Sequence, residues 1–201
     1  MKMKNVFKKL GLFGVIIGLS LSMTSCGYNS MVKKEESVSA AWGQVENVYQ
    51  RRMDLIGNLV KTVSAEAGFE KSTLVAVQEA RSNATKVTID ASKLTPENVK
   101  QFQLAQDGLG NVLSRLMSVA ENYPNLKSNE AFHDMMSELE GTENRIAVER
   151  RNFNTAVQDY NSTIRSFPEN LTAKMFGFQT KGYFTASAGA DKAPDVKFDI
   201  K

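Results

Sequence analysis

The stretch FHDMMSELEGTENRIAVERRNFNTAVQDYNSTIRSF, residues 132–167, carries the pattern that decides the fold. Its key positions follow one another in alternating steps of four and three residues: Phe132, Met136, Leu139, Glu143, Ile146, Arg150, Phe153, Val157, Tyr160, Ile164 and Phe167. Side chains at this heptad spacing form a seam along one face of an α-helix. We therefore expect a long helix that Ser128 or Asn129 caps and that ends near Phe167.

Two earlier segments repeat the same spacing. The first seam is Val38, Trp42, Val45, Tyr49, Arg52, Ile56, Leu59 and Val63, and the middle one is Val99, Phe102, Gln106, Leu109, Leu113, Leu116 and Ala120. Helices with seams of period 3.5 cross at shallow angles, near 20°, in left-handed bundles. Strict alternation of apolar and polar residues is rare in these segments, so the sequence predicts an all-α fold.

Glycine and proline mark the expected helix boundaries. Gly68 follows the first seam as either a kink or a turn, and a further helix is expected from about residue 70 to residue 87. Thr95-Pro96-Glu97 reads as an N-cap, a proline at the first helical position and an acid in the first turn. Alternation in residues 196–200 predicts a short strand or an extended strap.

Three charged residues occupy seam positions where an apolar side chain would pack better: Arg52, Glu143 and Arg150. A charge taken out of water is costly unless it is paired. We expect an ion pair between Arg52 and Glu143, with Arg150 nearby, that fixes the register of an otherwise repetitive seam. The alternative is that these charges face a crevice and form a binding site.

The sequence contains few residues that could serve catalysis. His133 is the only histidine, so its Glu130-x-x-His133 motif lacks the second copy that a di-iron site requires. Nucleophile elbows, phosphate loops and dinucleotide motifs are absent, and a single cysteine excludes disulfide frameworks and thiolate metal sites. We predict no catalytic residue, cofactor or metal. The alternative, a hydrolase using Glu138, Glu140 and Glu143, conflicts with helix geometry, because positions i, i+2 and i+5 do not share a face.

The N-terminal 26 residues have the order of a secretory leader. A lysine-rich start precedes an uncharged, mostly apolar run over residues 10–23, and Met23-Thr24-Ser25-Cys26 then resembles the lipobox of bacterial lipoproteins. That resemblance implies cleavage before Cys26 and lipidation of its thiol. The alternative is an uncleaved signal anchor with an incidental cysteine. Removing the leader takes four lysines from 25 basic residues against 22 acidic ones, and the remainder has no basic excess that would indicate nucleic acid.

Four aromatic residues gather behind Pro168: Phe176, Phe178, Tyr183 and Phe184. Two interpretations remain open for them. They cover the end of the bundle, or they form an exposed patch for a partner or a membrane surface.

Several motifs together resemble the LemA family. They are YNSMV at 28–32, AWGQV at 41–45, QRRMDLIGNLV at 50–60, YPNL at 123–126, ELEGTENRI at 138–146, RRNFN at 150–154 and YN at 160–161. The resemblance implies an antiparallel, up-and-down four-helix bundle and a membrane-associated protein, and it brings no catalytic residues. Many members begin with one membrane-spanning segment, whereas this chain resembles a lipoprotein there.

These observations give one expectation for the whole chain. Residues 1–25 form a lipoprotein signal peptide, residues 26–184 a helical bundle and residues 185–201 an extended tail. We expect a non-enzymatic scaffold or interaction protein, lipid-anchored to a bacterial membrane, that faces the periplasm or the cell exterior and meets an unknown envelope partner. A binding module for an apolar ligand between helices is the alternative, and the heptads are equally compatible with self-association.

Overall fold

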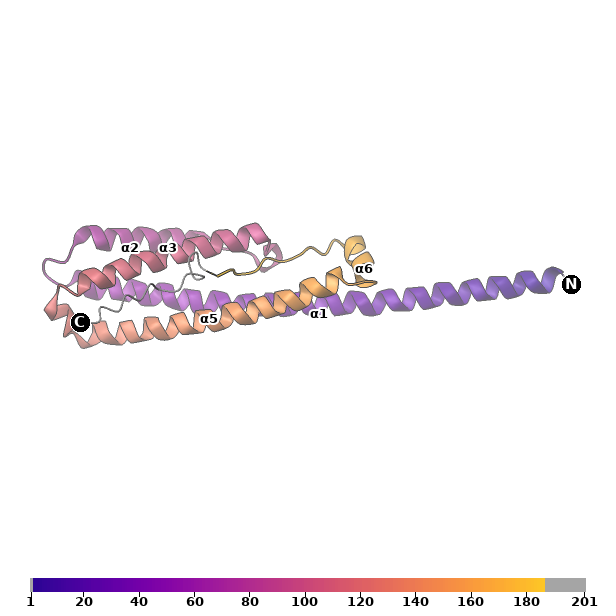
Figure 1. Ribbon diagram of the computed structural model, residues 1–201, viewed down its shortest axis with the longest axis horizontal. Coiled ribbons are helices and arrows are strands. Elements are labelled where there is room, and N and C mark those ends of the chain that lie inside the picture. The colour runs from indigo at the N-terminus through magenta and orange to yellow at the C-terminus, as the bar shows by residue number, and fades with distance from the viewer. Residues whose placement is uncertain (1, 187–201) are drawn as a thin grey trace, which may run out of the picture. The chain divides into compact units, whose positions relative to one another are not determined.

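The computed structural model describes residues 2–186, with side chains from residue 27 onward. Every regular element in that range is helical, which confirms the all-α class (Figure 1). The elements are α1 (Lys2–Ser64), α2 (Lys71–Lys86), the 3₁₀ turn η1 (Ala91–Lys93), α3 (Pro96–Ala120), α4 (Pro124–Lys127), α5 (Glu130–Arg165) and α6 (Glu169–Phe176). The strand or strap expected at residues 196–200 lies outside the described residues.

The chain divides into two compact units. The first combines the chain up to Tyr49 with Arg145–Lys181, and the second combines Gln50–Asn144 with the chain from Gly182 onward. Helices α1 and α5 both continue from one unit into the other.

In the first unit, the core lies between α1 and α5. Seam residues of α1 (Val38, Trp42, Val45, Tyr49) and of α5 (Ile146, Phe153, Val157, Tyr160, Ile164) are buried. The rings of Trp42 and Phe153 meet at 5.4 Å between centroids, so the two predicted seams face each other here.

In the second unit, five helices supply one core. Its buried members are Met53, Leu55, Ile56, Leu59, Val60 and Val63 of α1, Phe69 of the loop after α1, Val77 and Ala84 of α2, Leu109, Leu116 and Ala120 of α3, Leu126 of α4, and Phe132 and Leu139 of α5. Helices α2 and α3 lie against each other (Figure 1). Burial of such apolar area is the main term that stabilises the unit.

The predicted boundaries are largely correct. Gly68 has φ +84°, so it forms a turn that ends the α1 segment rather than a kink. The hydroxyl of Thr95 accepts from Asn98 N at 3.2 Å, as the predicted N-cap of α3 requires. Asn129 caps α5, since its Oδ1 accepts from Phe132 N at 3.2 Å.

α5 ends close to the expected residue, but the predicted seam does not stay buried to its end. The helix stops at Arg165, and Phe167, the last residue of the predicted seam, is 79% exposed. The heptad pattern of the sequence therefore extends beyond the end of the helix. It does not bury Phe167, because the chain turns before Pro168. Among the residues that the structure describes, none of the helices combines the length and the apolar character needed to cross a membrane.

Candidate binding site

A pocket of about 520 Å³ opens in the second unit between α1, α3 and α5. One part of its lining is apolar: Leu59, Leu113, Met117, Met136 and Leu139. The other part is polar or charged: Arg52, Ser114, His133, Ser137, Glu140 and Glu143, with Gly110 beside them. Thus two of the three predicted seam charges line a crevice.

Arg52 and Glu143 meet at this pocket. The Nη2 of Arg52 lies 3.3 Å from Oε2 of Glu143, but only 8% of the Arg52 side chain is exposed against 59% of the Glu143 side chain. The ion pair expected between Arg52 and Glu143 is therefore present, but Glu143 is exposed to water rather than withdrawn from it. α5 places Glu143 at the solvent edge of the seam, from which its carboxylate reaches the buried guanidinium.

Gly110 provides room for that guanidinium. A Cβ at this position would lie 3.3 Å from Nη2 of Arg52, a tighter distance than side chains normally adopt. A residue without a side chain on α3 thus allows a buried cation on α1 to reach the pocket.

Arg150 lies in the first unit. Its Nε donates to the Tyr49 hydroxyl at 2.7 Å, and its guanidinium carbon lies 5.6 Å from the centroid of the Tyr49 ring. The aromatic residue opposite therefore gives this seam cation both a hydrogen-bond acceptor and a π face.

The three glutamates of the hydrolase alternative are not gathered at one point. Glu140 and Glu143 line the pocket, whereas Glu138 pairs with Arg51 at 3.1 Å on an exposed surface. His133 Nε2 contacts the carbonyl oxygen of Lys127. No group of three His, Cys, Asp or Glu side chains in the described part of the chain is arranged to hold a metal ion. The pocket thus combines an apolar wall with polar and charged side chains.

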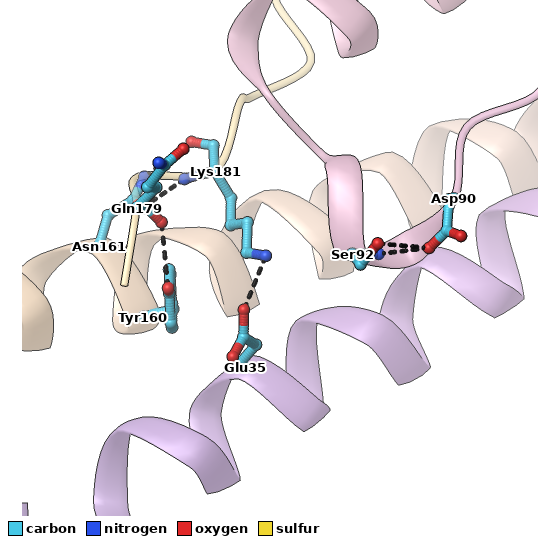
Figure 2. A network of polar contacts seen from close by, with 7 residues as sticks. All are labelled: Glu35, Asp90, Ser92, Tyr160, Asn161, Gln179 and Lys181. Atoms are coloured by element: carbon cyan, nitrogen blue, oxygen red, sulfur yellow. Dashed lines mark hydrogen bonds and ion pairs between the residues drawn. The ribbon is translucent and has the colours of Figure 1, made fainter. Parts of the chain in front are cut away.

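A second polar constellation holds the segment after α6 in the first unit (Figure 2). The side-chain amide of Asn161 donates to the carbonyl oxygen of Lys181 and accepts from its N–H, both at 2.9 Å. The Tyr160 hydroxyl donates to the carbonyl oxygen of Gln179 at 3.0 Å. We call residues 178–186 the strap, since side chains of the helices hold its backbone.

Lys181 is the charged residue of this constellation. Only 8% of its side chain is exposed, its Nζ lies 2.8 Å from Oε1 of Glu35 on α1, and it lies 5.7 Å from the centroid of the Tyr160 ring (Figure 2). Burial, together with the nearby Glu35 carboxylate, raises the pKa of Tyr160 to about 12.

The strap is held in the same manner in the second unit. Gln103 Nε2 donates to the carbonyl oxygen of Thr185 at 2.9 Å, and Thr185 N donates to Gln103 Oε1 at 3.0 Å. Gly182 N donates to Leu94 O at 2.9 Å. Sequence reasoning missed this device. The sequence signals of this arrangement are the side-chain amides of Asn161 and Gln103. An amide in a helix does not indicate which distant backbone segment it will bind.

The η1 turn carries a smaller polar group. The carboxylate of Asp90 accepts from the N–H of Ser92 at 2.8 Å and from its hydroxyl at 2.7 Å (Figure 2). These bonds hold the pKa of Asp90 below its ordinary value. They satisfy backbone at the start of the turn, which is a capping role.

The aromatic residues behind Pro168 have different environments. Phe184 is buried and packs against Phe102 at 6.3 Å between ring centroids, whereas Phe176 and Tyr183 remain 54% and 42% exposed. Phe184 therefore belongs to the packed interior, whereas Phe176 and Tyr183 remain open to solvent. Cys26 lies in the part of α1 whose side chains the structure does not describe.

Comparisons with known proteins place the chain among named relatives. The model of the LemA family matches residues 41–198. The chain is 31% identical over 185 residues to Magnetosome protein MamQ 2 of Paramagnetospirillum magneticum and, equally, to Magnetosome protein MamQ of Magnetospirillum gryphiswaldense. Each match covers 82% of this chain and 66% of the relative, so the chain spans just under two thirds of their length. Protein LemA of Metamycoplasma hominis is 22% identical over 159 residues, which cover 79% of this chain and 69% of that protein.

Proposed function

The chain belongs to the LemA family, and from this premise we propose that it is a lipid-anchored, non-enzymatic envelope protein that binds a protein partner through its helical body. The pocket at Arg52 and Glu143 is the observation that carries this proposal. An apolar wall beside polar and charged side chains fits an amphipathic segment of a partner. Met117 and Met136 suit such a surface, because methionine adapts its shape to what it contacts.

The anchor in this proposal is Cys26. Residues 1–25 are removed as a signal peptide, and palmitate or similar acyl chains on the new N-terminus hold the protein to the outer side of the cytoplasmic membrane or to the outer membrane. More than one acyl chain is needed for firm attachment, since each buried methylene contributes about 0.8 kcal/mol. Cys26→Ser should prevent acylation. The protein should then either leave the membrane fraction or accumulate as the larger, uncleaved precursor.

We propose the body, residues 26–184, as an antiparallel, up-and-down four-helix bundle made by α1, α2, α3 and α5. Two features support this arrangement: α1, α2, α3 and α5 all contribute to the core of the second unit, and α2 and α3 pack together. Residues 185–201 form the tail. The heptad seams leave homo-oligomers as a further mode of assembly.

The test is photo-crosslinking in intact cells. A photo-reactive amino acid replaces Ser137 or Met117, which line the pocket, and replaces Leu104 of α3 as a control that is 62% exposed and outside the pocket lining. A discrete protein adduct at both pocket positions, absent at Leu104 and weakened by Cys26→Ser, is expected. Equal labelling at all three positions would contradict a partner at the pocket.

A second function, a binding module for an amphipathic small molecule, is favoured by the volume of the same pocket. Its 520 Å³ lies within the range of about 300–1,000 Å³ that is typical of ligand sites. Fatty acids and lysophospholipids would then raise the melting temperature of the protein. Ser137→Trp, which fills the pocket from an exposed position, should remove that shift, and an unchanged shift would place the ligand elsewhere.

A further inference from the structure

The short helix α6 presents large apolar side chains to solvent. Phe167 before the helix and Leu171, Met175 and Phe176 within it are 79%, 61%, 68% and 54% exposed. We call these four residues the α6 apolar face. Leu171 and Met175 lie one turn apart on the same side of the helix, while Ala173 on the opposite side is buried. Such a cluster of exposed apolar residues is typical of an interaction surface.

The α6 apolar face lies beside the residues that follow Cys26. The ring of Tyr28 meets Phe176 at 4.8 Å and Phe178 at 5.8 Å between centroids. A Cβ at Gly27 would lie 3.7 Å from Cγ of Glu169 in the first turn of α6. Tyr28 thus contacts α6 and its flank, and Gly27 lies beside the first turn of α6, all within the first unit.

The charges around α6 are also suited to a lipid surface. Lys174 lies on the exposed side of α6, and the exposed Arg165 closes α5 just before it. Glu169 is the acidic residue of the helix, and it is directed toward Gly27. Cations beside exposed apolar side chains are the composition of helices that lie in the boundary between lipid headgroups and acyl chains.

We propose that α6 docks on the bilayer that carries the acyl anchor, with Leu171 and Met175 inserted at the headgroup boundary. This inference rests on the proposed lipidation of Cys26, because the anchor and the face emerge from the first unit at adjoining positions. The anchor then supplies attachment, and α6 supplies a second contact that limits how the first unit can tilt on the membrane.

Fluorescence quenching tests the docking on the full chain. Tryptophan is placed at Leu171 or Met175, and at Leu104 of α3 as a matched exposed position, with the parent chain as the blank for Trp42. The proteins are reconstituted in phosphatidylethanolamine and phosphatidylglycerol vesicles whose acyl chains carry bromine near the headgroup. We expect quenching at positions 171 and 175 to exceed that at position 104 by about twofold or more, and Leu171→Asp should reduce the quenching at 175.

The other outcomes would overturn the inference. Access to acrylamide at 171 and 175 equal to that at 104, without bromolipid quenching, would mean that the face stays in water. Shielding from acrylamide without bromolipid quenching would mean that a second copy or another protein covers it. Mass spectrometry of the N-terminal peptide in the same samples tests the anchor separately, so a failed docking with acylated Cys26 leaves the proposed function standing.

Discussion

Gly182 shows how one residue permits the strap to cross the start of α3. A Cβ at this position would lie 2.7 Å from Cα of Pro96 and 2.9 Å from the carbonyl oxygen of Thr95, both of which are backbone atoms. Backbone cannot move aside as the end of a side chain can. The absence of a side chain is therefore what allows Gly182 N to reach Leu94 O.

The first prediction follows from this contact. Gly182→Ala should lower the free energy of unfolding by about 1–3 kcal/mol, because the added methyl overpacks the contact. Gly108→Ala is the matched control. A Cβ at Gly108, which lies on α3, would meet nothing within 4 Å. Because alanine is a better helix former than glycine, this substitution should raise the free energy of unfolding by up to about 1 kcal/mol. Urea unfolding of the two variants checks the prediction, and the same sign for both would contradict it.

The second prediction concerns the buried hydroxyl of Tyr160. Its pKa is about 12 in the folded chain against an ordinary value of 10.0, since burial disfavours the phenolate. A raised folded pKa means that the stabilisation is fully present below pH 10 and is lost as the pH rises from 10 to 12, where the unfolded chain releases the proton first. Urea midpoints of the parent chain should fall over this window.

Tyr160→Phe is the control for that titration. The variant should be less stable at neutral pH, because the carbonyl oxygen of Gln179 loses its donor, and its midpoint should decline less between pH 10 and pH 12. Parallel alkaline profiles for the parent and the variant would show that other groups govern the loss.

At the scale of elements, the strap depends on side-chain amides rather than on a β-ladder. Asn161 provides the donor and the acceptor that a neighbouring strand would otherwise supply to Lys181, and Gln103 does the same for Thr185. Buried backbone polar groups need such partners. The strap is thereby fixed without any regular element of its own.

The third prediction tests this role. Asn161→Ala removes both bonds to Lys181 and leaves buried backbone groups unsatisfied, so we expect a loss of about 2–3 kcal/mol in the free energy of unfolding. Amide hydrogen exchange at Lys181 should increase as well. Gln158→Ala, an exposed position on the same helix, is the control and should change either quantity little. A loss of stability without faster amide exchange at Lys181 would show that Asn161 stabilises α5 and does not hold the strap.

The helices themselves were predictable because each signal is local. The N-cap at Thr95, the break at Gly68 and the seam of α1 depend on residues within a few turns of one another. The exposure of Phe167 was not predictable from the seam, since the heptad gives a direction only while the chain remains helical. The exposure of Glu143 was missed for a related reason: the edge of a seam depends on how closely the neighbouring helices approach.

At the scale of the whole molecule, α1 and α5 run through both compact units. The two units should then unfold together in one cooperative transition. Fraying α1 or α5 in one unit removes hydrogen-bonded turns that continue into the other.

The fourth prediction measures that coupling. Leu116 of α3 is fully buried in the second unit, whereas Trp42, the only tryptophan, is fully buried in the first. Leu116→Ala should cost about 2–5 kcal/mol and should lower the urea midpoint seen by Trp42 fluorescence as much as the midpoint seen by circular dichroism. A Trp42 transition that stays at the parent midpoint would show that the units unfold independently.

The sequence by itself determined the helical class, most helix boundaries and the residues of the seams, because hydrophobic periodicity and capping are encoded in neighbouring residues. It also carried the residues on which the proposed lipid anchor at Cys26 rests, and the motifs of the LemA family. Only the tertiary structure buried Arg52 and left Glu143 exposed in the lining of one pocket, bound the strap through Asn161 and Gln103, and brought Tyr28 against α6. These features join residues distant in the chain, and their geometry depends on the packing of whole helices.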